Sequence, residues 1–200
     1  MASYETFAQS QIDDEAGTGT ANNIVGHLLD SSNTLNGKYI TEVTFRLKAD
    51  PTTTSGSYYC RVYSSSGTLK HTFGSASMSG LGDSFANYTF TTDYDTAIAE
   101  NDCICIEANN DNLKIAQRDG DVSPNGHRVR GNSGSSFILD TTKDIFFACE
   151  YSDSGGSGGG GSGGGGGSSG GSSSDGSISG TGGSSYNPEY AMRLNIGYIR

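Results

Sequence analysis

Residues 38–50, with the sequence KYITEVTFRLKAD, alternate between apolar and polar side chains along their whole length. Val43, Phe45 and Leu47 therefore share one side of an extended chain, with charged and hydroxyl side chains on the other side. This period of two predicts a β-strand with one buried and one solvated face. Because a sheet with one apolar face has to pack on a second layer, this strand restricts the chain to a layered architecture.

Similar short segments recur along the chain, separated by turn-forming residues. Strands are expected at 57–64, 68–73, 85–93, 103–108, 112–117, 136–140 and 144–152, with weaker candidates at 4–9 and 24–31. Residues 118–136 are expected to form a long irregular excursion. Since no ten-residue helical pattern appears, the sequence predicts an all-β fold, an antiparallel β-sandwich.

Residues 154–185 consist almost entirely of Gly and Ser, and a strand-like segment follows at 186–200. Its alternating apolar side chains are Tyr190, Met192, Leu194, Ile196 and Tyr198. Because a lone strand is unstable, we expect this assembly strand to complete a sheet. A flexible tract of this length spans roughly 28–34 Å, enough to return the strand to its own domain, whereas an extended tract reaches a neighbouring copy. The expected organisation is a sandwich at 1–153, a Gly/Ser-rich loop or arm, and a terminal strand in either sheet.

The charge of the chain excludes two classes of partner. With 22 acidic and 12 basic residues the net charge is −10, which repels phosphate backbones and anionic lipids. We therefore expect no nucleic acid and no membrane as partners. No run approaches the roughly 18 apolar residues of a membrane span, and the start MASYETFAQSQ lacks the features of a signal peptide. The expectation is a protein made in the cytoplasm without a signal peptide.

The four cysteines are Cys60, Cys103, Cys105 and Cys149. None forms a CxxC pair and no histidine is close in sequence, so a zinc site is not expected. Each lies in an apolar strand-like run, which predicts buried free thiols. The alternative is a disulfide that joins Cys60 or Cys149 to Cys103 or Cys105.

The sequence contains no recognisable catalytic motif. The three histidines lie on separate segments, and no GxSxG, HExxH or phosphate-binding glycine motif occurs in a suitable context, so we expect no enzyme. Asp119, Asp121 and Asn125 have part of the spacing of a calcium loop but lack its closing glutamate. A structural calcium ion is the only cofactor that this pattern allows, and ordinary turn chemistry is the alternative.

A second candidate site lies on the strand predicted at 57–64. Tyr59, Arg61 and Tyr63 share one side of this strand, so two aromatic rings flank a cation. Such a face can stack a sugar ring or a protein surface, which makes these residues candidate ligand-binding residues. The alternative is that they pack against a neighbouring strand or loop.

Two long segments resemble known domains, namely GKYITEVTFRLKADPTTTSGSYYCRVYSSSGTLKHTF and FANYTFTTDYDTAIAENDCICIEANN. They are similar to jelly-roll β-sandwich domains of phage and viral structural proteins and of carbohydrate-binding appendages. The matching positions are Ile40, Val43, Phe45 and Leu47 in a strand, Ser66, Gly67, Thr68 and Leu69 in a turn, and Tyr88, Phe90 and 103–107 in later strands. The resemblance covers roughly residues 24–151. The chain departs from the pattern at Asn101 and Cys103, where Gly and Tyr are usual, and it has no tryptophan.

The resemblance implies a jelly-roll fold. Together with the acidic sandwich, the missing motifs and the long arm, it favours a non-enzymatic structural or capsid-decorating protein of a virion. Such a protein acts through contacts with other virion subunits or with copies of itself. Two alternatives stay open: a carbohydrate- or receptor-binding module like that of a tail-fibre adhesin at the extracellular surface, and a self-assembling filament subunit that donates its terminal strand.

Overall fold

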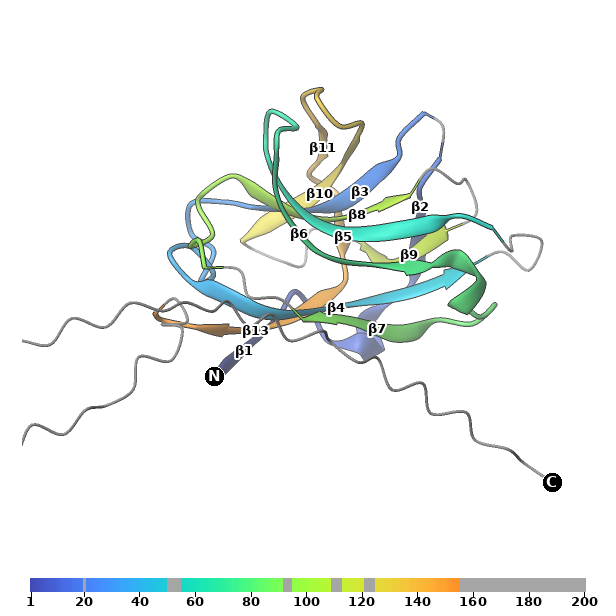
Figure 1. The fold of residues 1–200 in the computed structure, drawn as a ribbon, viewed down its shortest axis with the longest axis horizontal. Coiled ribbons are helices and arrows are strands. Elements are labelled where there is room, and N and C mark those ends of the chain that lie inside the picture. The colour runs from blue at the N-terminus through green and yellow to red at the C-terminus, as the bar shows by residue number, and fades with distance from the viewer. Residues whose placement is uncertain (20, 50–54, 92–94, 109–112, 121–124, 155–200) are drawn as a thin grey trace, which may run out of the picture. The chain divides into compact units, whose positions relative to one another are not determined.

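The protein is described by a computed structural model that covers residues 1–19, 21–49, 55–91, 95–108, 113–120 and 125–154. Within these residues the chain forms thirteen β-strands and two short 3-10 helices, at Gln9–Gln11 and Met78–Gly80 (Figure 1). All strand pairings are antiparallel. The all-β prediction is therefore confirmed. No helix in this part of the chain has the length and apolar character to cross a membrane.

The strands form two sheets, which we call sheet A and sheet B. Sheet A has the order β1-β13-β4-β9-β12, with β2 beside β9 and β7 beside β4. Its strands are β1 (Ala2–Glu5), β2 (Asp14–Gly17), β4 (Tyr39–Ala49), β7 (Ala86–Thr91), β9 (Leu113–Asp119), β12 (Lys143–Ile145) and β13 (Phe147–Ser152). Sheet B has the order β11-β10-β3-β8-β5-β6. Its strands are β3 (Ile24–Leu29), β5 (Ser57–Ser64), β6 (Leu69–Ser77), β8 (Asp102–Ala108), β10 (Gly126–Gly131) and β11 (Ile138–Asp140).

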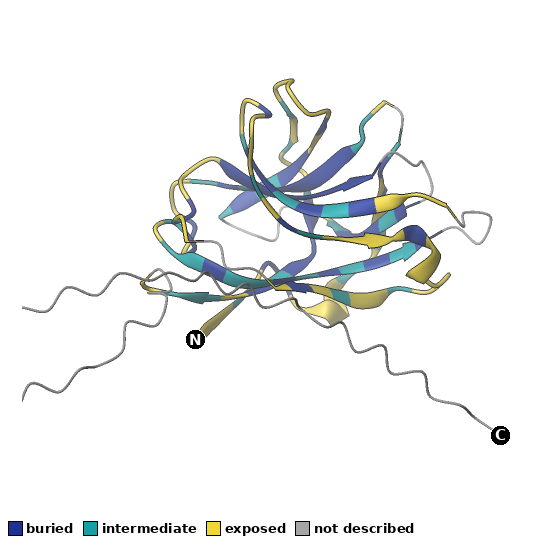
Figure 2. Cartoon of the chain, viewed as in Figure 1, coloured by how far each residue is buried: buried dark blue, intermediate teal, exposed yellow. Residues whose placement is uncertain are grey.

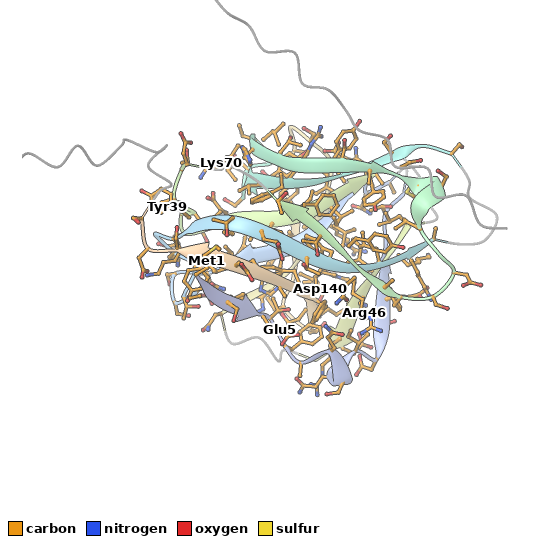
Figure 3. The ribbon with its side chains drawn as sticks, turned by 60° about the horizontal axis from the view of Figure 1, so that its bottom comes forward. Met1, Glu5, Tyr39, Arg46, Lys70 and Asp140 are labelled. Atoms are coloured by element: carbon orange, nitrogen blue, oxygen red, sulfur yellow. The ribbon has the colours of Figure 1, made fainter. Side chains whose placement is uncertain are left out.

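Strand β4 has the buried and solvated faces that its sequence predicts. Val43, Phe45 and Leu47 are fully buried, while the residues between them keep part of their surface in water (Figure 2). Figure 3 turns the solvated face of sheet A forward, where Glu5 and Arg46 are labelled. The alternation therefore sets which face of sheet A enters the core.

One hydrophobic core lies between the two sheets. Phe45 and Phe147 of sheet A belong to the same buried cluster as Tyr58, Val62 and Ile104 of sheet B. Burial of each such side chain contributes about 1.5–3 kcal/mol to folding. Two antiparallel sheets around one core confirm the β-sandwich, and the jelly-roll refinement stays a prediction.

The expectation of an irregular excursion over 118–136 is wrong for β10. This strand lies inside sheet B between β3 and β11. In its sequence, GHRVRG, one of the buried positions is taken by a charged residue, Arg128. The apolar alternation that usually reveals a strand is therefore missing. The guanidinium of Arg128 is held there by Gln117 and Asp140, so polar partners replace the apolar contacts that sequence patterns reveal.

A second, smaller core covers part of the outer face of sheet B. Its buried members are Ile24, Tyr63, Cys103, Cys105 and Val129, with Phe137 packed against them. Cys60 and Cys149 are buried as well, and all four cysteines are free thiols, as predicted. Burial raises the pKa of the Cys60 and Cys105 thiols, which keeps both protonated and unreactive at neutral pH.

The Gly/Ser tract at 155–185 and the predicted assembly strand lie outside the described residues. The strand positions concerned are Tyr190, Met192, Leu194, Ile196 and Tyr198. Every described strand comes from residues 2–152.

Gly26 allows β3 to approach β8, and it provides a test of this packing. A Cβ at position 26 would lie 2.3 Å from the carbonyl oxygen of Ile104 and 2.5 Å from Sγ of Cys105. We expect Gly26→Ala to lower the free energy of unfolding by about 1–3 kcal/mol, measured by urea denaturation. Gly80→Ala is the control, because a Cβ there meets nothing within 4 Å. Equal urea midpoints for the two variants would contradict the packing.

Candidate functional site

The structure brings the three predicted ligand-binding residues of β5 together. The guanidinium of Arg61 lies over the ring of Tyr59, 4.2 Å from its centroid, and Nη1 of Arg61 donates to the hydroxyl of Tyr63 over 3.4 Å. Tyr59 and Arg61 are partly exposed, whereas Tyr63 is fully buried. The predicted aromatic–cation arrangement is therefore present on this strand, with its exposed part at Tyr59 and Arg61.

Glu107 of the neighbouring strand β8 holds this arrangement in place. Its carboxylate accepts hydrogen bonds from Nη1 of Arg61 and from the hydroxyl of Tyr63, and Nδ2 of Asn23 donates to it over 3.5 Å. Burial, with the hydrogen bond to Glu107, raises the pKa of Tyr63 to about 12, so the hydroxyl stays a donor at neutral pH. Sequence patterns did not indicate Glu107, because its role depends on the pairing of β5 with β8.

Tyr63 does not present its ring to solvent. The ring of Phe137, which precedes β11, packs edge-on against it at a centroid distance of 5.7 Å. For Tyr63 the structure thus shows the packing alternative. Ligand binding at Tyr59 and Arg61 stays a prediction.

The predicted calcium ligands have different partners in the structure. Oδ1 of Asp119 accepts from Nζ of Lys143 at 2.5 Å, while Oδ1 of Asn125 accepts from Oγ of Ser32 at 3.1 Å. Asp121 lies outside the described residues. Over the ranges that the structure describes, no three His, Cys, Asp or Glu side chains gather as a metal site. A loop calcium ion stays a prediction, and the described contacts are those of ion pairing and turns.

A buried polar pair lies between the two sheets, at a place that the sequence did not indicate. Nδ1 of His27, on β3, is 3.9 Å from Oδ1 of Asp144, on β12, and both side chains are fully buried. The imidazole also packs on the ring of Phe147, with 5.6 Å between the ring centroids. Within the described residues, neither ring nitrogen of His27 has a hydrogen-bond partner. The spacing of residues in β3 could have indicated this position. His27 lies two residues from both Val25 and Leu29, so its side chain points inward with theirs.

The electrostatics of this pair make His27 a stability determinant. Burial lowers the pKa of the imidazole to about 3, with His127 acting in the same direction and Asp30 opposing it. His27 is therefore neutral in the folded protein at neutral pH. Because the pair is enclosed on all sides, it contributes to folding and does not reach a ligand in solvent.

No protein-family model, curated protein or solved structure matches this chain. The class that the fold defines is an antiparallel β-sandwich with two small buried clusters beside its main core. Its function has to be inferred from the surfaces and buried groups of the chain itself.

The pKa of His27 predicts how stability depends on pH. Below pH 6.5, the ordinary value, the unfolded chain takes up a proton at His27, whereas the folded protein does so only near pH 3. Stability is therefore lost as the pH falls below 6.5, by about 2 kcal/mol at pH 5. Urea denaturation between pH 4 and pH 7 measures this loss.

The matched variants are His27→Gln and His71→Gln. Partial burial also lowers the pKa of His71. The control therefore removes a histidine whose pKa is shifted in the same direction but which is not completely buried. We expect His27→Gln to flatten the pH dependence more than His71→Gln does. An unchanged slope in His27→Gln would contradict the burial of a neutral imidazole.

Proposed function

We propose that this chain is a non-enzymatic structural or decorating protein of a virion, which acts through protein–protein contacts. The observation that carries the proposal is a set of three exposed aliphatic side chains on two adjoining hairpins of sheet B, which we call the apolar patch. Leu69, Ile138 and Leu139 expose 43%, 54% and 47% of their surface. Apart from Met1, they are the exposed large hydrophobic residues in the described part of the chain. Exposed aliphatic groups on adjoining hairpins make this end of the sheet a candidate contact surface.

Backbone hydrogen bonds hold the two hairpins of the patch side by side (Figure 1). The amide of Gly134 donates to the carbonyl of Gly67 over 2.9 Å, and the amide of Phe137 donates to that of Ser65 over 3.4 Å. Gly67 has a φ of +79°, and a Cβ there would lie 2.0 Å from the carbonyl oxygen of Ser135. The patch is therefore fixed before any partner binds, which lowers the entropy that binding costs.

The position of β11 supports the same proposal. Among the described strands β11 pairs only with β10, so it is an edge of sheet B. Edge strands present unpaired backbone donors and acceptors, and an apolar edge is a template for another chain. The only acidic residue of β11, Asp140, forms an ion pair with Arg128. The one carboxylate of this edge strand is therefore paired within the chain.

The buried free thiols are consistent with synthesis in the cytoplasm, which the proposal assumes. Four reduced cysteines suit a protein that folds in a reducing cytoplasm, where virions of the proposed kind assemble.

The proposal predicts that the protein co-purifies with virus particles and that the apolar patch is needed for this. Ile138→Asp combined with Leu139→Asp should lower the amount bound to particles after density-gradient fractionation, because two carboxylates cannot be buried without partners. The control is Asn87→Asp combined with Thr89→Asp, which adds the same charge on β7. Absence of the unchanged protein from purified particles would refute the function, and equal binding of both double variants would refute the role of the patch.

A further inference from the structure

Strand β7 is an edge of sheet A that lacks the usual protection against another strand. Among the described strands it pairs only with β4, so its other side is open (Figure 1). Its sequence ANYTFT contains no charged residue and no proline, and Tyr, Thr and Phe favour strands. Its exposed residues are Ala86, Asn87, Thr89 and Thr91. An edge strand of this kind is a template for a strand of another chain.

The other described strands that pair on one side only are protected. Strands β11 and β12 have three residues each, β1 and β2 have four, and each of these strands contains a charged residue. Strand β6 has nine residues, but it carries Lys70 and its pairing with β5 shifts register twice. Short length, charge and bulges are the features that keep edges from pairing. In contrast, β7 pairs with β4 over six residues without a shift.

Strand β7 is held in place on both of its faces. On the outer face, the Oγ1 atoms of Thr44 and Thr89 form a hydrogen bond of 2.7 Å between β4 and β7. On the inner face, the rings of Tyr88 and Phe90 pack edge-on against Tyr58 of sheet B, with centroid distances of 6.4 and 6.0 Å. The edge is therefore formed before a partner binds, which lowers the entropy that binding costs.

The side chains of β7 are complementary to those of a second β7. If two copies pair antiparallel, inner residues must lie opposite inner residues, because each face has to continue across the joint. In the register centred on Thr89, this residue lies opposite its own copy, Tyr88 lies opposite Phe90, and Asn87 lies opposite Thr91. Threonine pairs and aromatic pairs are favourable in these positions. No charges are opposed, although each chain has a net charge of −10.

The charges beside β7 favour the same antiparallel orientation. On β4, Glu42 lies opposite Thr91 and Arg46 lies opposite Asn87. In the register centred on Thr89, Arg46 of one copy is therefore in the same row as Glu42 of the second copy. Three strand spacings, about 14 Å, separate them. At this distance salt screens most of the attraction, so these charges contribute to the choice of orientation more than to affinity.

We propose that the protein forms a homodimer in which two β7 strands pair antiparallel about a twofold axis at Thr89. The two copies of sheet A would then form one continuous sheet. This inference goes beyond the proposed function, because it names a second copy of the chain as a partner and needs no virus particle. It uses no residue of the apolar patch, so the two proposals can fail independently.

The mass of the full chain in solution tests the dimer. Over roughly a hundredfold range of concentration, sedimentation should show a rise from the mass of one chain to twice that mass. Thr89→Lys places two ammonium groups opposite each other at the axis and should weaken the dimer roughly tenfold or more. Thr44→Lys is the matched control, because it removes the same hydrogen bond and adds the same charge one strand further from the edge.

The control variant should dimerise like the unchanged protein, and both variants should have similar urea midpoints at low concentration. If the unchanged protein is a monomer at every concentration, the proposal is overturned and the edge is left to another occupant. Equal weakening of the dimer in the two variants would also overturn it.

A mixture of two variants tests the position of the axis. Thr89→Lys and Thr89→Glu should each be largely monomeric alone, whereas an equal mixture should dimerise, because opposite charges then face each other. A mixture that stays monomeric would refute the register centred on Thr89. The variant with Asn87→Asp and Thr89→Asp should also be monomeric while it still binds to virus particles, which separates this edge from the apolar patch.

Discussion

The pairing of β4 with three other strands is the constraint on which the sandwich depends. Along one edge β4 pairs with β7, and along the other it pairs first with β13 and then with β9. Because side chains alternate with a period of two, a slip of one residue in this register would turn Val43, Phe45 and Leu47 out of the core. The same register carries β13 and β9 to the positions from which Phe147 meets His27 and Gln117 meets Arg128.

One side of the sandwich interior is polar. Phe45 and Phe147 fill the centre of the sandwich, while His27, Asp144 and Arg128 occupy buried positions near β10 and β12. Buried polar groups need partners, and Arg128 finds Gln117 and Asp140. The three polar side chains come from β3, β10 and β12, so this polar side forms only when the two sheets meet.

The strands that the sequence predicted well include those with apolar alternation, such as β4 and β5. In both of them the buried face is recognisable from the strand alone. The features that it did not predict depend on residues far apart in the chain. Arg128 makes β10 look irregular until Gln117 and Asp140 are placed beside it, and Tyr63 looks available for a ligand until Phe137 covers it.

The most direct test of the sandwich is urea unfolding of a chain that ends at Ser154, measured beside the full-length protein. All described strands and the three buried hydrophobic clusters come from residues 2–152, so the shortened chain should unfold in one cooperative transition with the midpoint of the full-length protein. Its mass in solution, measured on the same samples, shows whether the terminal segment contributes to self-association. A shortened chain that has no cooperative transition would contradict the claim that β4 and its partners form a complete fold.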